Sequence, residues 1–367
     1  MRAASRIRPP GRTGSSTLVI GFLRAVGRGS GSLTRVPVIL EAGSGAVAGV
    51  FREDRPADIA NVLVRTLVPP REVRVTKDSY LVGLIGSGIG PSLSPALHQR
   101  EADRQGLRYV YRLIDIDTLG VPPEAVGDLV RAARDLGFDG LNITHPCKQL
   151  VIEHLDALDP QAEALGAVNT VVFDGGRATG HNTDVTGFAA SFARGLPDAP
   201  LERVVQLGAG GAGAAVAHAV LTLGAGRVTV VDALPDRAAA LAAALDRHFG
   251  PGRAAAATPD QLPELLAEAE GGGGLVHATP TGMAAHPGLP LPVELLNPGL
   301  WVAEVVYRPL ETELLRAARA CGCAALGGGG MAVFQAADAF RLFTGREADS
   351  VRMLADIAEL AGLEQVV

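Results

Sequence analysis

The chain has 367 residues, of which 47% are hydrophobic and 20% are charged, and its formal net charge is −6. This composition allows a large buried core and excludes an intrinsically disordered chain. The body of the chain has no basic cluster and no apolar run of about 18 residues, so we expect no nucleic-acid partner and no membrane span. The three cysteines, an odd number, favour a reducing compartment, and we expect a cytoplasmic protein.

Residues 1–77 differ in composition from the rest of the chain. The first 40 residues contain seven arginines and no acid, and a short apolar patch runs from Leu18 to Leu23. The patch is too short and too broken for a convincing targeting signal. We interpret residues 1–77 as an extension that is disordered or non-native, since Val75 is the residue that an internal GTG start codon would encode.

From Tyr80 onward, short apolar runs alternate with segments of helical spacing, which predicts an α/β fold. The first part has predicted strands at 80–85, 109–114, 138–144, 168–173 and 177–180, of which the last two form a hairpin. Its predicted helices lie at 94–105 and 123–136. A third helix follows the strand at 138–144 and ends at about residue 155, and a fourth begins at residue 160. Ser94 is expected to cap the first helix, with Pro95 in its first turn. A second unit begins near Asp184, with predicted strands at 203–207, 227–231, 275–278 and 301–305 and a loop at 271–274. Its predicted helices lie at 185–195, 235–248, 331–343 and 349–360, and a further helix follows the glycine-rich segment and ends at residue 223.

A glycine-rich segment lies between the strand at 203–207 and the helix that follows it. Its residues are Gly208, Ala209, Gly210, Gly211, Ala212 and Gly213, which match G-x-G-x-x-G. In a dinucleotide-binding fold the three glycines permit a tight turn, close approach to a pyrophosphate, and close packing of helix on strand. The helix N-terminus then faces the phosphate charge.

Asp232 ends the next predicted strand, 19 residues after Gly213. A carboxylate at this position accepts hydrogen bonds from both ribose hydroxyls and repels a 2′-phosphate, so we expect NAD rather than NADP as the cofactor. Arg237, further along the chain, is either solvated or directed at a phosphate.

Lys148 and Asp184 lie in two segments rich in Asn and Thr, NITHPCK at 142–148 and GHNTD at 180–184. Both residues stand at predicted strand-to-helix junctions. When a secondary alcohol loses hydride its hydroxyl must also lose a proton, and an uncharged amine can accept that proton while a carboxylate orients the amine. From these residues alone, two ordinary surface groups remain the alternative.

Several motifs between about Tyr80 and Leu360 occur together and in a fixed order. They are SLSP at 92–95, NITHPCK at 142–148, GAVNT at 166–170, NTD at 182–184, the glycine loop, ATP at 278–280, YRP at 307–309 and MAVFQ at 331–335. In this combination the chain resembles the shikimate/quinate dehydrogenase family. With an aspartate at position 232, it is similar to the branch of that family that uses NAD and accepts quinate.

The resemblance implies two α/β domains with a cleft between them: a substrate domain of residues 78–184 and 331–367, and a Rossmann domain of residues 185–330. It implies reversible hydride transfer between NAD and C3 of shikimate or quinate, with Lys148 and Asp184 handling the proton and no metal. Implied substrate contacts are Ser92, Ser94, Thr144, Asn169, Tyr307 and Gln335, and implied contacts near the nicotinamide are Thr279 and Met331.

Alternatives stay open for several of these residues. Ser94 could act only as a helix cap, Asn169 as a turn residue, Gln335 as a solvated side chain and Met331 as a core residue. At the level of function, the rivals are an amino-shikimate dehydrogenase of secondary metabolism and a non-catalytic NAD-binding sensor. We expect a small-molecule substrate and a monomer or homodimer.

Three positions depart from the pattern of the family, all on the cofactor side. His277 stands where Asn is common, and Glu304 stands where Asp is usual. Gly327–Gly330 occupy the segment where an Asp often precedes the glycine before Met331.

Overall fold

The computed structural model describes strands β1 (Leu18–Val26) and β2 (Leu33–Glu41) and residues 77–362. The chain divides between residues 75 and 76 into two units. In the first unit, β1 and β2 pair as antiparallel strands. The rest of the extension lies outside the described residues, so its predicted disorder stays a prediction.

The second unit begins with a six-stranded mixed sheet in the order β4-β3-β5-β7-β8-β6. Its strands are β3 (Ser79–Gly86), β4 (Arg108–Asp115), β5 (Gly140–Ile143), β6 (Ala157–Leu158), β7 (Thr170–Asp174) and β8 (Arg177–His181). β3, β4 and β5 run parallel, whereas β7 is antiparallel to β5. The predicted hairpin is confirmed: Gly175 and Gly176 join β7 to β8 with φ of 55° and 82°, as a two-residue type I′ turn requires.

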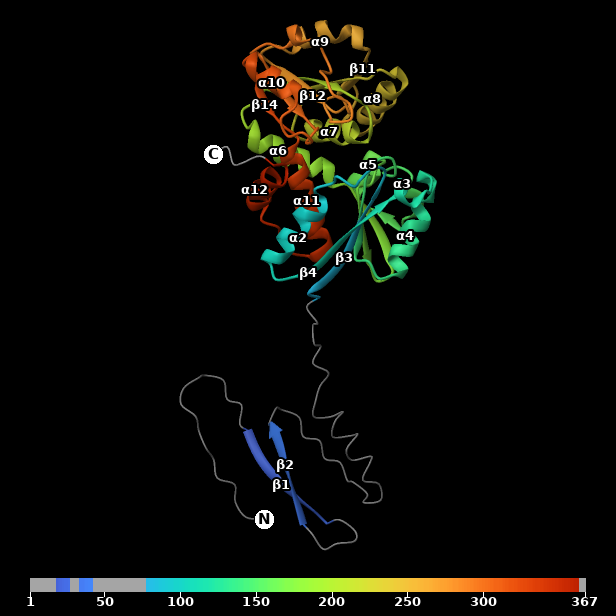
Figure 1. Ribbon diagram of the computed structural model, residues 1–367, viewed down its shortest axis with the longest axis vertical. Coiled ribbons are helices and arrows are strands. Elements are labelled where there is room, and N and C mark those ends of the chain that lie inside the picture. Colours follow the sequence, from blue (N-terminus) through green and yellow to red (C-terminus); the bar gives the residue numbers. More distant parts are fainter. Residues whose placement is uncertain (1–17, 27–32, 42–76, 363–367) are drawn as a thin grey trace, which may run out of the picture. The chain divides into compact units, whose positions relative to one another are not determined.

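Different helices cover the two faces of this sheet (Figure 1). They are α2 (Ser94–Arg104), α3 (Ile116–Leu119), α4 (Val126–Asp135), α5 (Pro160–Leu165) and, from the end of the chain, α11 (Gly329–Thr344) and α12 (Ser350–Leu360). Side chains alternate along a strand, so Ile85 of β3 packs with α3 and α4 on one face. Val82 and Leu84 pack with Phe340 of α11 on the other face. The C-terminal helices therefore return to the first sheet.

Two local predictions in this region are wrong. Helix α2 begins at Ser94 with Leu93 in the cap position, and Ser94 does not cap it; instead the backbone N–H of Ser94 donates to Ser92 Oγ at 3.3 Å. The helix predicted to run to about residue 155 is a series of turns followed by a short 3-10 helix (Ile152–His154). The carbonyl of Lys148 accepts the N–H of Val168 at 2.8 Å, so a long-range bond replaces the helical one.

The second sheet has six parallel strands in the order β11-β10-β9-β12-β13-β14. They are β9 (Arg203–Leu207), β10 (Arg227–Val231), β11 (Ala254–Ala257), β12 (Gly273–His277), β13 (Leu300–Glu304) and β14 (Ala324–Leu326), accompanied by α7 (Gly211–Thr222), α8 (Pro235–Phe249), α9 (Leu262–Ala269) and α10 (Glu313–Ala320). The predicted loop at 271–274 is wrong in its second half, because Gly273 and Gly274 begin β12. A Cβ built on Gly274 would lie 2.3 Å from the Trp301 ring, so the neighbouring strand requires glycine there.

Helix α6 (Thr183–Gly195) packs against α7 of the second sheet and against α11, which also contacts α2, β3 and β7 of the first sheet (Figure 1). The contact of α6 with α11 is close. A Cβ on Gly187 would lie 2.7 Å from the backbone N of Gln335, and one on Gly330 would lie 2.2 Å from Ser191 Oγ. The two helices therefore hold Asp184 and Gln335 in a fixed relation.

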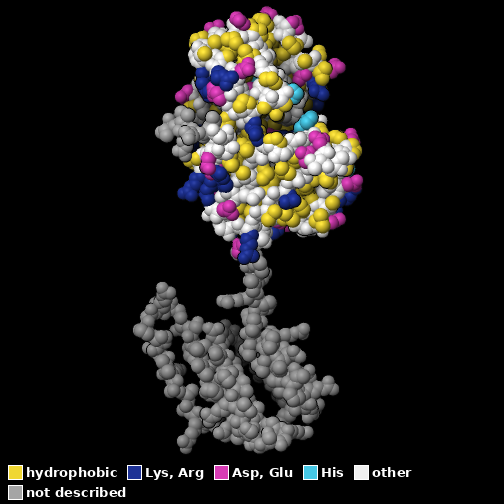
Figure 2. Space-filling view, in the orientation of Figure 1, with side chains coloured by type: hydrophobic (Ala, Val, Ile, Leu, Met, Phe, Trp, Pro, Cys, Tyr) yellow, Lys and Arg dark blue, Asp and Glu magenta, His cyan; other side chains and the backbone are white. Residues whose placement is uncertain are grey.

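The visible surface carries charges of both signs. On the face in Figure 2, the Lys and Arg side chains are interspersed with Asp and Glu. None of the helices in the described part of the chain is both long and apolar enough to cross a membrane.

The close contact of α6 and α11 predicts that Gly187→Ala destabilises the protein. In an open helix this change stabilises by about 1 kcal/mol, but here the added Cβ must displace the α11 backbone, at a cost of about 1–3 kcal/mol. The midpoint of denaturant unfolding measures the effect. Gly90→Ala is the control, because a Cβ there meets no atom within 4 Å. Equal stability of both variants would contradict the close contact.

Candidate active site

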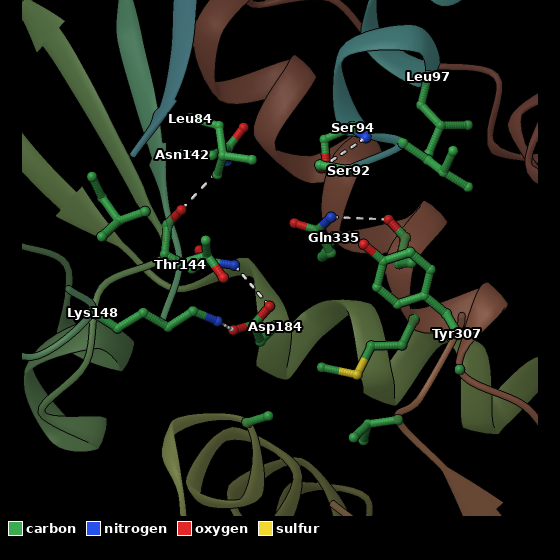
Figure 3. Close-up of a pocket in the computed structure, with 18 residues that line it drawn as sticks. Leu84, Ser92, Ser94, Leu97, Asn142, Thr144, Lys148, Asp184, Tyr307 and Gln335 are labelled. Carbon is green, nitrogen blue, oxygen red and sulfur yellow. Dashed lines mark hydrogen bonds and ion pairs between the residues drawn. The ribbon is translucent and has the colours of Figure 1, made fainter. Parts of the chain in front are cut away.

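A cavity of about 240 Å³ brings together segments from both sheets and the two central helices (Figure 3). Among its lining residues are Ser92, Ser94, Thr144, Lys148, Asn169, Asp184, Ala212, Tyr307, Met331 and Gln335, all of which the sequence singled out. Lys148 and Asp184 point toward each other, while Ser92, Ser94, Tyr307 and Gln335 lie across the cavity from Lys148. The structure thus collects residues that are up to 243 positions apart in the sequence, from Ser92 to Gln335.

The shortest polar contact in the cavity joins Lys148 to Asp184, with Nζ 2.6 Å from Oδ2. Lys148 comes from the turns after β5, and Asp184 lies in the first turn of α6. Only 19% and 10% of their side chains, respectively, are exposed. An amine and a carboxylate held in contact within a largely enclosed site can bind a hydroxyl group and exchange a proton with it.

Asn169 fixes the carboxylate of Asp184. Its Nδ2 donates to Asp184 Oδ1 at 2.9 Å, and its Oδ1 accepts the backbone N–H of Thr183 at 2.8 Å. Asn182 caps α6 by accepting the N–H of Asp184 at 3.0 Å. Asn169 and Asp184 are buried, so the orientation of the carboxylate is set by bonds with little competition from water.

The hydroxyl groups of Ser92, Ser94 and Tyr307 lie on the wall of the cavity opposite Lys148. Burial raises the pKa of Tyr307, while the Arg308 charge and a hydrogen bond with Ser92 act in the other direction. Nearby, burial also raises the pKa of Tyr111, whose hydroxyl donates to Asn142 Oδ1 at 2.7 Å. These phenols stay neutral at physiological pH, so this wall offers hydrogen-bond donors without a formal charge of its own.

The glycine loop lies between β9 and α7, next to the lysine. Gly208 has φ of +101°, which favours glycine, and a Cβ on Gly213 would lie 2.2 Å from the Gly208 carbonyl oxygen. A Cβ on Gly210 would meet no atom within 4 Å, so the loop faces open space at that point. A Cβ on Gly211 would lie 3.8 Å from Lys148 Cδ, so the loop adjoins the lysine.

Of the predicted cofactor residues, Ala212 and Met331 line the cavity, whereas Asp232 and Thr279 stand at strand ends of the second sheet. Asp232 follows β10, and its Oδ2 accepts the N–H of Ala209 at 2.8 Å while Oδ1 accepts the N–H of Leu234 at 2.9 Å. Thr279 follows β12, and its Cγ2 lies 3.1 Å from a Cβ built on Gly208. The order β10-β9-β12 therefore places Asp232 and Thr279 on opposite sides of the glycine loop.

The structure adds residues that the sequence did not assign to the site. Asn142 lines the cavity and donates to Thr170 Oγ1 at 3.1 Å; its place in the NITHPCK motif was the available signal.

Two of the positions that depart from the family pattern contact each other: His277 Nδ1 lies 2.8 Å from Glu304 Oε1. No signal in one sequence could pair them, because they are 27 residues apart.

The cysteines and histidines of the described region form no group of three or more metal-ligand side chains, counted together with Asp and Glu. Cys147 and Cys323 are buried, and burial raises the pKa of both thiols. Buried thiols with a raised pKa stay protonated at neutral pH and are unreactive.

Two sheets, a glycine loop at a helix N-terminus and an adjoining polar cavity define an α/β protein of the dinucleotide-binding class. A family model described as "Shikimate dehydrogenase substrate binding domain" matches residues 84–171. The chain is 85% identical over 292 residues to "Shikimate dehydrogenase (NADP(+))" of Streptomyces avermitilis, a match that covers 80% of this chain and 99% of the relative. It is 49% identical over 284 residues to "Quinate/shikimate dehydrogenase (NAD(+))" of Corynebacterium efficiens, covering 77% and 99%.

Among solved structures, "Quinate dehydrogenase from Corynebacterium glutamicum in complex with NAD" matches with a TM-score of 0.72 and 48% identity, covering 77% of this chain and 99% of that one. The chain belongs to the shikimate dehydrogenase family. The resemblance that the motifs indicated is confirmed, as is the α/β fold with its two sheets.

The raised pKa of Tyr307 predicts that its phenol is still protonated at pH 10, the ordinary pKa of tyrosine. Subtracting the alkaline absorbance titration of Tyr307→Phe from that of the wild type isolates this group. We expect the difference to show a midpoint above pH 10. A midpoint at or below pH 10 would mean that the phenol is exposed to water or that the Arg308 charge outweighs burial.

Proposed function

We propose that this protein oxidises a ring hydroxyl of shikimate or quinate to the 3-dehydro product, reversibly and with NAD as the hydride acceptor. The contact of Lys148 with Asp184 inside a polar cavity, beside a glycine loop, is the observation that carries the proposal. The names of the relatives, which include shikimate and quinate dehydrogenases, support the substrate class.

Lys148 and Asp184 handle the proton in this proposal. The uncharged amine of Lys148 accepts the hydroxyl proton as the C–H bond of the same carbon breaks with loss of hydride, and the carbon becomes a ketone. In the reverse direction the charged amine returns that proton. Asp184 holds the amine through Oδ2, and Asn169 holds Asp184 through Oδ1, so the proton acceptor is positioned before the substrate binds.

The rest of the cavity fits a polyhydroxylated ring acid. Ser92, Ser94 and Tyr307 present hydroxyl groups on the wall opposite Lys148, where we place the carboxylate of the substrate. Thr144, Asn169 and Gln335 present further polar atoms for the ring hydroxyls. This placement turns the hydroxyl to be oxidised toward Lys148.

The glycine loop and the strand ends beside it fit a dinucleotide. The open space at Gly210 leaves room for a pyrophosphate at the N-terminus of α7, where backbone N–H groups favour negative charge. Ala212 and Met331 line the cavity on the side of the loop. A bound nicotinamide cofactor supplies the hydride acceptor in the oxidation.

We favour NAD over NADP because of Asp232. Two backbone N–H groups hold its carboxylate at the end of β10, where it would meet the adenosine ribose. The relatives divide on this point, since the Streptomyces avermitilis protein is named for NADP(+) and the Corynebacterium efficiens protein for NAD(+). A fixed negative charge repels a 2′-phosphate, and for this reason we favour NAD.

We also propose a substrate domain of residues 78–184 and 331–367 and a cofactor domain of residues 185–330. The contacts of α11 with α2, β3 and β7 support the assignment of the C-terminal helices to the first domain.

The cofactor proposal predicts initial rates that are highest with NAD when shikimate and quinate are each tested with NAD and NADP. Asp232→Ala is expected to lower the NAD-to-NADP ratio of kcat/KM by about 10- to 100-fold, since hydrogen bonds to the charged carboxylate are lost and repulsion of the 2′-phosphate ends. Asp236→Ala, which removes an exposed acid nearby, is the control. Turnover only with NADP in the wild type would refute the choice of NAD, and cofactor binding with no turnover of either acid would favour the amino-substrate or sensor alternative.

The proton-transfer proposal predicts that Lys148→Met lowers kcat by about 10²- to 10⁴-fold while reduced cofactor still binds. Fluorescence titration with the reduced cofactor measures that binding. Lys77→Met is the matched control, because Lys77 is the only other lysine of the chain and pairs with Asp139 away from the cavity. A Lys148→Met variant that keeps more than a tenth of the wild-type kcat would rule out Lys148 as the proton acceptor.

A further inference from the structure

A buried chain of polar side chains runs through the carboxyl ends of β12 and β13, outside the cavity. His277 and Glu304 are the last residues of these strands and lie opposite each other in register. His277 Nε2 lies 2.5 Å from Thr279 Oγ1, and Thr312 donates its hydroxyl to Glu304 Oε2. Thr312 also caps α10 (Figure 1 labels β12 and α10), so the chain connects the segment after β12 to that helix.

Burial fixes the side chains of His277 and Glu304. Both side chains are 0% exposed, so water does not compete for their hydrogen bonds. His277 contacts Glu304 through Nδ1 and Thr279 through Nε2, so the imidazole cannot turn without losing both contacts.

This arrangement orients the hydroxyl of Thr279. Its oxygen is hydrogen-bonded to His277 Nε2 and also accepts the backbone N–H of Thr281 at 3.3 Å. A hydroxyl group can take part in three hydrogen bonds, so one position is left for a ligand. The side chain of Thr279 is partly exposed, and its methyl group packs near Gly208.

The sheet order shows what lies on the side of Thr279. Asp232 and Thr279 flank the glycine loop from opposite sides, because β9 lies between β10 and β12. A dinucleotide whose adenosine ribose is at Asp232 and whose pyrophosphate crosses the loop has its nicotinamide half on the β12 side. The cavity lies there as well, since Val305, which donates its N–H to the carbonyl of His277 at 3.0 Å, lines it.

We propose that His277 and Glu304 are positioning residues that hold the Thr279 hydroxyl in place for a hydrogen bond with the nicotinamide half of the cofactor. This inference rests on the proposed function only for the identity of the cofactor. It assigns a role to two positions that depart together from the family pattern. The hydroxyl is preset by the buried pair, so the cofactor does not have to reorganise the loop.

The test compares two ligands, reduced NAD and ADP-ribose, which lacks the nicotinamide. Thr279→Val keeps the shape of the side chain and removes the hydroxyl. We expect it to weaken binding of reduced NAD about five- to tenfold, the effect of one hydrogen bond, and to leave the affinity for ADP-ribose unchanged. Thr279→Ser, which keeps the hydroxyl, is expected to bind both ligands like the wild type. Fluorescence titration measures reduced NAD, and competition against it measures ADP-ribose.

The buried pair is tested by replacing both members, His277→Leu together with Glu304→Met, which leaves no unpaired charge. We expect this double variant to lose affinity for reduced NAD, and we expect Thr279→Val to add no further loss in its background. Additive losses, or full affinity in the double variant, would overturn the role of the pair. If the double variant does not fold, the two variants at Thr279 decide alone.

Equal weakening of both ligands by Thr279→Val, or of neither, would overturn the inference, as would a wild type that does not bind reduced NAD. These binding measurements require no turnover. A protein that shows the expected binding but oxidises neither shikimate nor quinate would refute the proposed function and leave this inference in place.

Discussion

The close contact of α6 with α11 is the constraint on which the rest of the structure depends. α6 carries Asp184 at its first turn, and α11 carries Gln335. Because Gly187 lies directly against the backbone of Gln335, the two helices cannot slide past each other without a steric clash. The same helices connect the sheets, since α6 packs on α7 and α11 packs on β3 and β7. The packing that unites the fold therefore also sets the geometry of the cavity.

Within that frame, the polar groups of the site are held by other polar groups of the chain. Asp184 receives hydrogen bonds from Lys148 and Asn169, and its backbone N–H is capped by Asn182. Ordering these side chains costs conformational entropy, and this entropy is lost when the protein folds and not when a ligand binds. A ligand then encounters a site in which the amine and the carboxylate are already positioned.

A second set of polar groups lies at the carboxyl ends of β12 and β13, outside the cavity. His277 and Glu304 are buried at the ends of adjacent strands, and no ligand needs to touch them. Such a pair contributes little net stability compared with apolar residues of the same volume. Its value is directional, because the buried imidazole contacts the hydroxyl of Thr279 and holds it in place.

Local patterns of the sequence determined the alternation of strands and helices, the type I′ hairpin at Gly175 and the glycine loop, because turns and periodicity depend on neighbouring residues. The motifs also determined the family. The tetra-alanine strand β11 and the strand start at Gly273 escaped prediction, because neither has strand propensity and both are held by pairing with distant strands. The turns after Cys147 replaced a predicted helix for the same reason, as Lys148 bonds to Val168. Only the tertiary structure could place His277 on Glu304 and Gly187 on Gln335, since contacts between distant residues arise from packing and leave no periodic trace in a single sequence.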